Sequence, residues 1–87
     1  MIHPEYNKKA FLLPESIHSC ACYHAKIFED GKYIFRIHDC LTGIRLRGDL
    51  NDETQLIESV EKFRVLAKAA TEFSTFIEDN YLNTPKI

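Results

Sequence analysis

The feature that most constrains this chain is a long run of helical periodicity from Asn51 to Leu82. Its apolar residues recur at steps of three, four and seven, which is the spacing of one helical face. They are Leu56, Val60, Phe63, Ala67, Ala70, Ile77 and Tyr81. Asp52 with Gln55 is the expected capping box at its start, Asn51 is a second cap candidate, and no glycine or proline interrupts the run. We therefore expect one amphipathic helix over this run, followed by a short tail over 83–87.

This helix is longer than any strand that the rest of the chain can form. About 30 helical residues span roughly 45 Å, whereas about eight strand residues span roughly 27 Å. The last part of the helix should extend past the sheet and carry four large apolar side chains with it. They are Phe73, Phe76, Ile77 and Tyr81. Because their exposure is costly, we expect a bend within 71–75, cover by the N-terminal arm (1–16), or burial against a second copy. Symmetric pairs are the commonest oligomers, so a homodimer is favoured.

Residues 17–50 alternate between apolar and polar side chains, which indicates strands with one buried face. We expect strands over 17–28 and 32–41, joined by a turn. A three-residue loop with Gly31 in the left-handed conformation pairs Phe28 with Lys32. This register separates apolar from polar side chains better than a two-residue loop, and a slip of one residue would exchange the faces.

A second turn is expected at Thr42-Gly43, because glycine is typical of tight hairpin turns. A two-residue loop there places Leu41 opposite Ile44. Asp49 then lies across from Arg36, which is a favourable cross-strand pair.

These elements predict a single α+β domain: a three-stranded antiparallel meander packed on one face by a long C-terminal helix, in the order β-β-β-α. A short fourth strand is allowed over Lys9–Leu13, within the arm. The apolar face gathers alternate residues of all three main strands. They are Ala21, Tyr23, Ala25, Ile27, Tyr33, Phe35, Ile37, Ile44, Leu46 and Leu50.

The opposite face is basic although the chain is acidic overall, with a net charge of −2 and a pI near 6.0. Its candidate binding residues are Lys26, Arg36, His38, Arg45 and Arg47. Arginine forms planar, bidentate contacts with carboxylates and phosphates. We expect this face to engage an acidic protein or an anionic ligand. A nucleic-acid partner is the alternative, weakened because the aromatics fall on the apolar face, and a merely solvated face is the third possibility.

The three cysteines offer a second alternative, a zinc site. In the expected register Cys20 neighbours Cys40 and Cys22 neighbours His38, and these four residues form the candidate ligand set. The C-x-x-C spacing of most structural zinc sites is missing, and Arg45 lies alongside Cys40, where positive charge disfavours a cation. The same arginine would favour a Cys40 thiolate, but a flat sheet offers no pocket for thiol catalysis.

The remaining signals bound the function class. An odd cysteine count suits a reducing compartment, the N-terminus lacks the regions of a signal peptide, and no apolar run is long enough to span a membrane. The sequence therefore predicts a small, cytoplasmic, non-catalytic binding or regulatory module, and no cofactor is expected.

Overall fold

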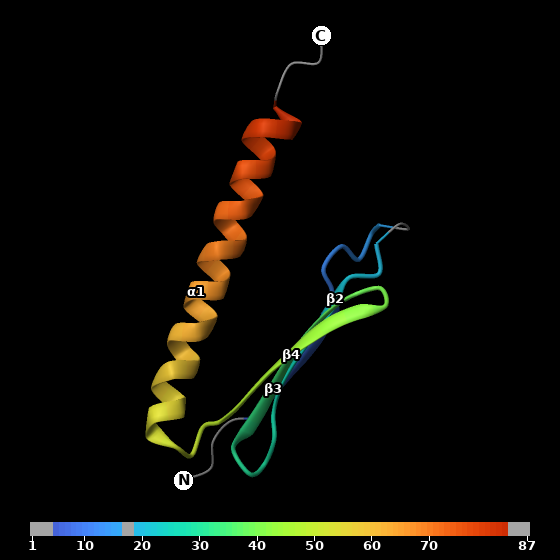
Figure 1. Ribbon diagram of the computed structural model, residues 1–87. Coiled ribbons are helices and arrows are strands. Elements are labelled where there is room, and N and C mark those ends of the chain that lie inside the picture. Colours follow the sequence, from blue (N-terminus) through green and yellow to red (C-terminus); the bar gives the residue numbers. More distant parts are fainter. Residues whose placement is uncertain (1–4, 17–18, 84–87) are drawn as a thin grey trace. The chain divides into compact units, whose positions relative to one another are not determined.

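The computed structural model of the chain describes residues 5–16 and 19–83, and it contains four strands followed by one long helix (Figure 1). The strands pair in the order β1-β2-β3-β4, and every pair is antiparallel. The elements are β1 (Tyr6–Phe11), β2 (Cys22–Ile27), β3 (Lys32–Asp39), β4 (Thr42–Asp49), α1 (Glu53–Ile77) and the short π-helix η1 (Glu78–Leu82). The α+β class is confirmed, with the allowed fourth strand present.

Two compact units divide the chain, one ending at Leu56 and the other beginning at Ile57. The first unit holds the whole sheet, and the second holds nearly all of α1 and then η1. The packing of the helix on the apolar sheet face stays a prediction.

The register between β2 and β3 is the expected one. Ile27 lies opposite Tyr33, and the Phe28 N–H donates to the Lys32 carbonyl at 2.8 Å. Gly31 closes the loop with a φ of +84°. Glycine adopts this left-handed conformation without steric cost, so the three-residue loop is confirmed.

The turn between β3 and β4 was predicted wrongly. The loop is Cys40-Leu41, with Cys40 at a φ of +56°. Ile44 consequently lies opposite Ile37 instead of Leu41, which moves β4 by four residues along β3. Because side chains alternate with a period of two, this even displacement leaves the predicted faces unchanged. It does change every cross-strand neighbour.

The misleading signal was Gly43, which is a strand residue and not a turn residue. Gly43 lies opposite His38, and a Cβ there would lie 2.5 Å from the His38 ring nitrogen Nδ1. Gly48 stands in the same relation to Tyr33, whose ring occupies the place of a Cβ. Cross-strand rings that cover strand glycines are a recognised way of pinning register. Both glycines therefore serve packing within the sheet.

At the N-terminal side, β1 starts at Tyr6, earlier than expected, and ends at Phe11. Strand β2 starts at Cys22, and the predicted strand positions 17 and 18 lie outside the described residues. The pairing of β1 with β2 places Lys9 opposite His24. A further cation thereby joins the polar face.

The helix begins as the sequence indicates, with one change in its cap. The Asp52 carboxylate oxygen Oδ1 accepts from the Thr54 and Gln55 N–H groups at 2.9 and 3.2 Å, which satisfies two free donors of the first turn. The Gln55 side chain does not complete the expected capping box, because its Oε1 accepts from the Asp49 N–H at 3.0 Å. The first turn of α1 and the last residue of β4 are thus hydrogen-bonded to each other through Gln55 and Asp49. No helix among the described residues is long and apolar enough to cross a membrane.

Candidate functional site

Cationic side chains form two neighbouring rows across the sheet. Directly opposite residues share a face, so the first row runs through Lys9, His24, Arg36 and Arg45 on the four successive strands. The second row runs through Asn7, Lys26, Ile34 and Arg47. We call the six basic residues of these rows the basic face: Lys9, His24, Lys26, Arg36, Arg45 and Arg47.

The centre of the basic face is a like-charge pair. Arg36 lies opposite Arg45, an arrangement that destabilises a sheet when nothing neutralises it. The sequence placed Asp49 in this position, but Asp49 lies opposite Lys32 at the end of the strands. Its Oδ1 accepts from the Asn51 N–H at 2.9 Å and from Asn51 Nδ2 at 3.0 Å. The corrected register thus removes the expected acid from beside Arg36.

The other polar groups leave these arginines without a carboxylate. His24 Nε2 and Asn7 Oδ1 are hydrogen-bonded at 2.7 Å, and the Lys26 ammonium lies 4.9 Å from the centroid of the Phe28 ring. Within residues 5–16 and 19–83, the ion pairs join Lys32 to Asp30 and Lys68 to Glu72. Neither ion pair involves an arginine.

Arg36 also has an unsatisfied donor. Its Nε is buried and has no hydrogen-bond partner among the described residues, which costs about 1–3 kcal/mol for a typical buried polar group. A shallow hollow of about 660 Å³ lies beside it. The hollow is lined by Phe28, Asp30, Lys32, Tyr33, Ile34, Arg36, Arg47, Gly48, Asp49 and Gln55. An anionic oxygen entering here would meet three cationic side chains, Lys32, Arg36 and Arg47, and two carboxylates, Asp30 and Asp49, of which Asp30 is paired with Lys32.

His38, the remaining predicted binding residue, lies in the next row. It stands opposite Cys22 on one side and Gly43 on the other, and its ring lies over Gly43. His38 therefore acts first as a packing residue of the β3–β4 pair.

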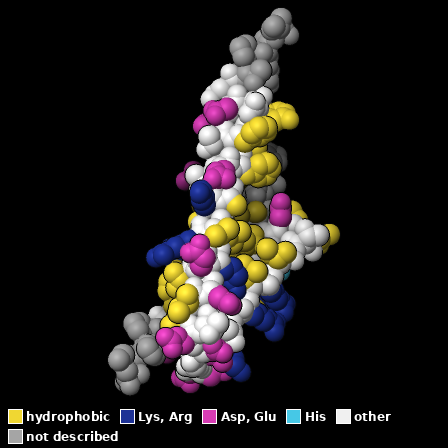
Figure 2. Space-filling model, turned by 60° about the vertical axis from the view of Figure 1, so that its left-hand side comes forward, with side chains coloured by type: hydrophobic (Ala, Val, Ile, Leu, Met, Phe, Trp, Pro, Cys, Tyr) yellow, Lys and Arg dark blue, Asp and Glu magenta, His cyan; other side chains and the backbone are white. Residues whose placement is uncertain are grey.

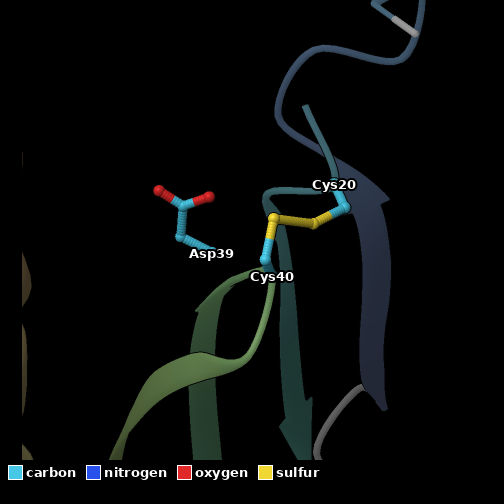
Figure 3. A group of neighbouring side chains, drawn as sticks. All are labelled: Cys20, Asp39 and Cys40. Atoms are coloured by element: carbon cyan, nitrogen blue, oxygen red, sulfur yellow. A yellow bond between two sulfur atoms is a disulfide. The ribbon is translucent and has the colours of Figure 1, made fainter. Parts of the chain in front are cut away.

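A separate group of side chains lies at the β3–β4 turn (Figure 3). Cys20 and Cys40 form a disulfide, with their Cα atoms 5.4 Å apart. Asp39 lies beside it, and the ligand atoms of the three residues are all within 4.8 Å of one another. We call Cys20, Asp39 and Cys40 the thiol cluster.

The thiol cluster differs in part from the four residues that the sequence indicated. Cys20 and Cys40 do meet, and Cys22 does pair with His38 across β2 and β3. Cys22 is a free cysteine, and the described cluster contains Asp39 in place of Cys22 and His38. By strand alternation Asp39 shares a face with Phe35 and Ile37, which is the apolar face, so sequence reasoning missed it. An acid directly before a turn cysteine was the available signal.

The distal part of the helix carries the exposed apolar residues that the sequence proposed as a dimer interface. Figure 2 shows apolar side chains in yellow along the upper part of α1. The exposed fractions are 66% for Phe73, 57% for Phe76, 44% for Ile77 and 72% for Tyr81. We call these four residues the distal helix patch.

No protein-family model, curated protein or solved structure matches the chain. The interpretation of these sites therefore rests on their own chemistry.

Proposed function

We propose that this chain is a small, non-catalytic binding or regulatory module whose basic face engages an acidic segment of a partner protein. One observation carries the proposal: Arg36 lies opposite Arg45, and neither forms an ion pair among the described residues. A carboxylate-bearing ligand would relieve that repulsion and would satisfy the buried Arg36 Nε. Charge-assisted bonds of this kind are about twice as strong as neutral hydrogen bonds.

The position of the aromatics favours an acidic protein segment over nucleic acid. Single-stranded nucleic acids bind by stacking bases on exposed aromatic rings. Tyr23 and Phe35 instead stack on each other, with centroids 6.2 Å apart, and they belong to the opposite face from Arg36. Phe28 is 43% exposed and borders the basic face, but the Lys26 ammonium lies over its ring. The basic face therefore offers more charge and arginine geometry than stacking surface.

Charge reversal tests the basic face. We expect Arg36→Glu, Arg45→Glu and Arg47→Glu each to weaken binding of a polyglutamate peptide by about 10-fold or more, corresponding to roughly 1.4 kcal/mol. Fluorescence anisotropy of the labelled peptide at fixed ionic strength measures the affinity. Arg64→Glu on α1 is the matched control, because it makes the same charge change outside the sheet.

Two results would contradict this assignment. Equal losses in the Arg64→Glu control and in the sheet variants would show that only net charge matters. Tighter binding of a single-stranded oligonucleotide than of the peptide, with a steep loss of affinity in salt, would favour the nucleic-acid alternative.

We further propose that the distal helix patch joins two copies of the chain. The exposure of its aromatic residues supports this proposal, because aromatic side chains dominate interface energetics. Native mass spectrometry should show a dimer that Phe76→Glu converts to a monomer. Val65→Glu is the control, because Val65 is also exposed on α1 but lies outside the patch. A monomeric wild-type chain would exclude the homodimer.

We place the module in the cytoplasm because its cysteine count is odd. In that compartment the Cys20–Cys40 pair would be largely reduced. Both cysteines would then be present as free thiols.

A further inference from the structure

The thiol cluster is not used by the proposed binding function. Its three residues are exposed, and they come from two places in the chain, the segment before β2 and the turn after β3. The disulfide holds the two sulfurs together in the oxidised state. Reduction would leave two thiols and a carboxylate whose ligand atoms lie within 4.8 Å of one another.

The geometry of this group suits a tetrahedral thiophilic cation. Zn–S bonds of about 2.3 Å separate two sulfur ligands by roughly 3.8 Å, and a carboxylate oxygen binds at about 2.0–2.2 Å. All three ligand atoms of the thiol cluster lie within 4.8 Å of one another. With Cα atoms 5.4 Å apart, Cys20 and Cys40 can both reach an ion between them.

The corrected register also removes the electrostatic objection to a metal. The expected turn placed Arg45 directly beside Cys40, but Arg45 pairs with Arg36. Four residues along a strand correspond to about 13 Å at roughly 3.3 Å per residue, which exceeds the Debye length at physiological salt of about 8 Å. Asp39 is the charged side chain next to the two sulfurs, and it forms no ion pair among the described residues.

We propose that Cys20, Asp39 and Cys40, in the reduced protein, form a site for a divalent cation of the zinc class, and that this state and the disulfide exclude each other. A dithiol reductant supplies two electrons and two protons, which break the S–S bond and give two thiols, while the reductant becomes a disulfide. Binding of Zn²⁺ then displaces both thiol protons and forms two Zn–S bonds. The Asp39 carboxylate supplies a third ligand, and water fills the fourth position.

Zinc titration of the intact chain in its two redox states tests the exclusion. The protein is reduced and desalted under anaerobic conditions, or left oxidised, and Zn²⁺ is added in competition with a chromophoric chelator. We expect one Zn²⁺ per reduced chain and none per oxidised chain, with native mass spectrometry confirming the stoichiometry. Equal zinc uptake by both forms would overturn the proposal.

Substitutions test the ligand set. Cys20→Ser and Cys40→Ser should abolish the stoichiometric site, and Asp39→Asn should weaken it by about 10-fold or more. The matched controls are Cys22→Ser and Asp79→Asn, which remove a thiol and an exposed carboxylate outside the cluster. Retained binding in Cys20→Ser, or an equal loss in Cys22→Ser, would show that the cluster is not the site.

A spectroscopic readout keeps the test valid if a cysteine variant fails to fold. Asp39→Asn retains both sulfurs and nearly the same shape, so it should fold like the wild type. Co²⁺ replacing Zn²⁺ should give thiolate-to-metal charge-transfer absorption in the reduced wild type and in Cys22→Ser. The ligand-field bands should change in Asp39→Asn, and unchanged bands together with unchanged affinity would remove Asp39 from the set.

Discussion

Gly31 and Cys40 stand at opposite ends of β3, and each is the left-handed residue of its turn, with φ values of +84° and +56°. The Gly31 turn is closed by hydrogen bonds from the segment that follows β4. Leu50 N–H donates to the Gly31 carbonyl at 2.9 Å, and Asn51 Nδ2 donates to the Asp30 carbonyl. The Cys40 turn has a hydrogen bond from Thr42 Oγ1 to the Asp39 carbonyl at 3.3 Å and, in addition, a covalent bond to Cys20.

The difference separates the two ends chemically. Hydrogen bonds at the Gly31 end do not depend on redox state, whereas the Cys20–Cys40 disulfide at the other end does. The hollow beside Arg36 borders the first end, since Asp30, Lys32 and Asp49 line it. The thiol cluster forms the second end. The proposed binding surface and a redox-dependent group therefore adjoin different turns of one sheet.

Reduction of the disulfide should have the larger effect on stability. The bond links residues 20 positions apart, and the loop-closure estimate for such a length is about 3 kcal/mol. We expect the free energy of unfolding of the wild type to fall by about this amount in metal-free reductant, measured by urea denaturation. The Cys20→Ser/Cys40→Ser double variant should match the reduced wild type and should not respond to reductant. A reductant response in the double variant would contradict this explanation.

The contrast between the two turns also explains what the sequence could predict. Glu29-Asp30-Gly31 contains the glycine that its left-handed position requires, and the separation of apolar from polar side chains selected the three-residue loop, so the β2–β3 register was predicted correctly. At the other end of β3, the turn was predicted at Thr42-Gly43 because of the glycine, whereas the left-handed residue of the observed turn is Cys40. Cys40 forms a disulfide with Cys20, which is 20 positions away in the sequence. Turn propensities consider only neighbouring residues, so they could not predict this contact.

For the candidate sites, as for the fold, the sequence predicted the faces of the strands correctly and the cross-strand neighbours between β3 and β4 incorrectly. Face assignment depends only on strand parity, so Arg36, Arg45 and Arg47 were placed together correctly even though the turn was wrong. Their neighbours depend on register, so the sequence paired Arg36 with Asp49 and missed its opposition to Arg45. Asp39 was missed because its proximity to the two sulfurs arises from the turn and not from strand alternation.

Gly31→Ala should have the smaller effect and should be independent of redox state. A non-glycine residue in the left-handed conformation costs about 1–2 kcal/mol. The added Cβ would also lie 2.5 Å from Asn51 Nδ2, so the Asn51 side chain must move and give up its bond to the Asp30 carbonyl. We expect urea denaturation to show a loss of about 2 kcal/mol in both the oxidised and the reduced protein.

A double-mutant cycle with Asn51→Ala separates backbone strain from the collision. Asn51→Ala alone should cost about 1 kcal/mol, because it removes the side-chain donor to Asp30 and Asp49. In the Asn51→Ala background, Gly31→Ala should cost less than in the wild type, because no side chain remains to be displaced. The residual cost then measures the left-handed backbone alone. Strictly additive losses would mean that Asn51 does not restrict position 31, and a dependence of either loss on reductant would show that the two ends of β3 are coupled.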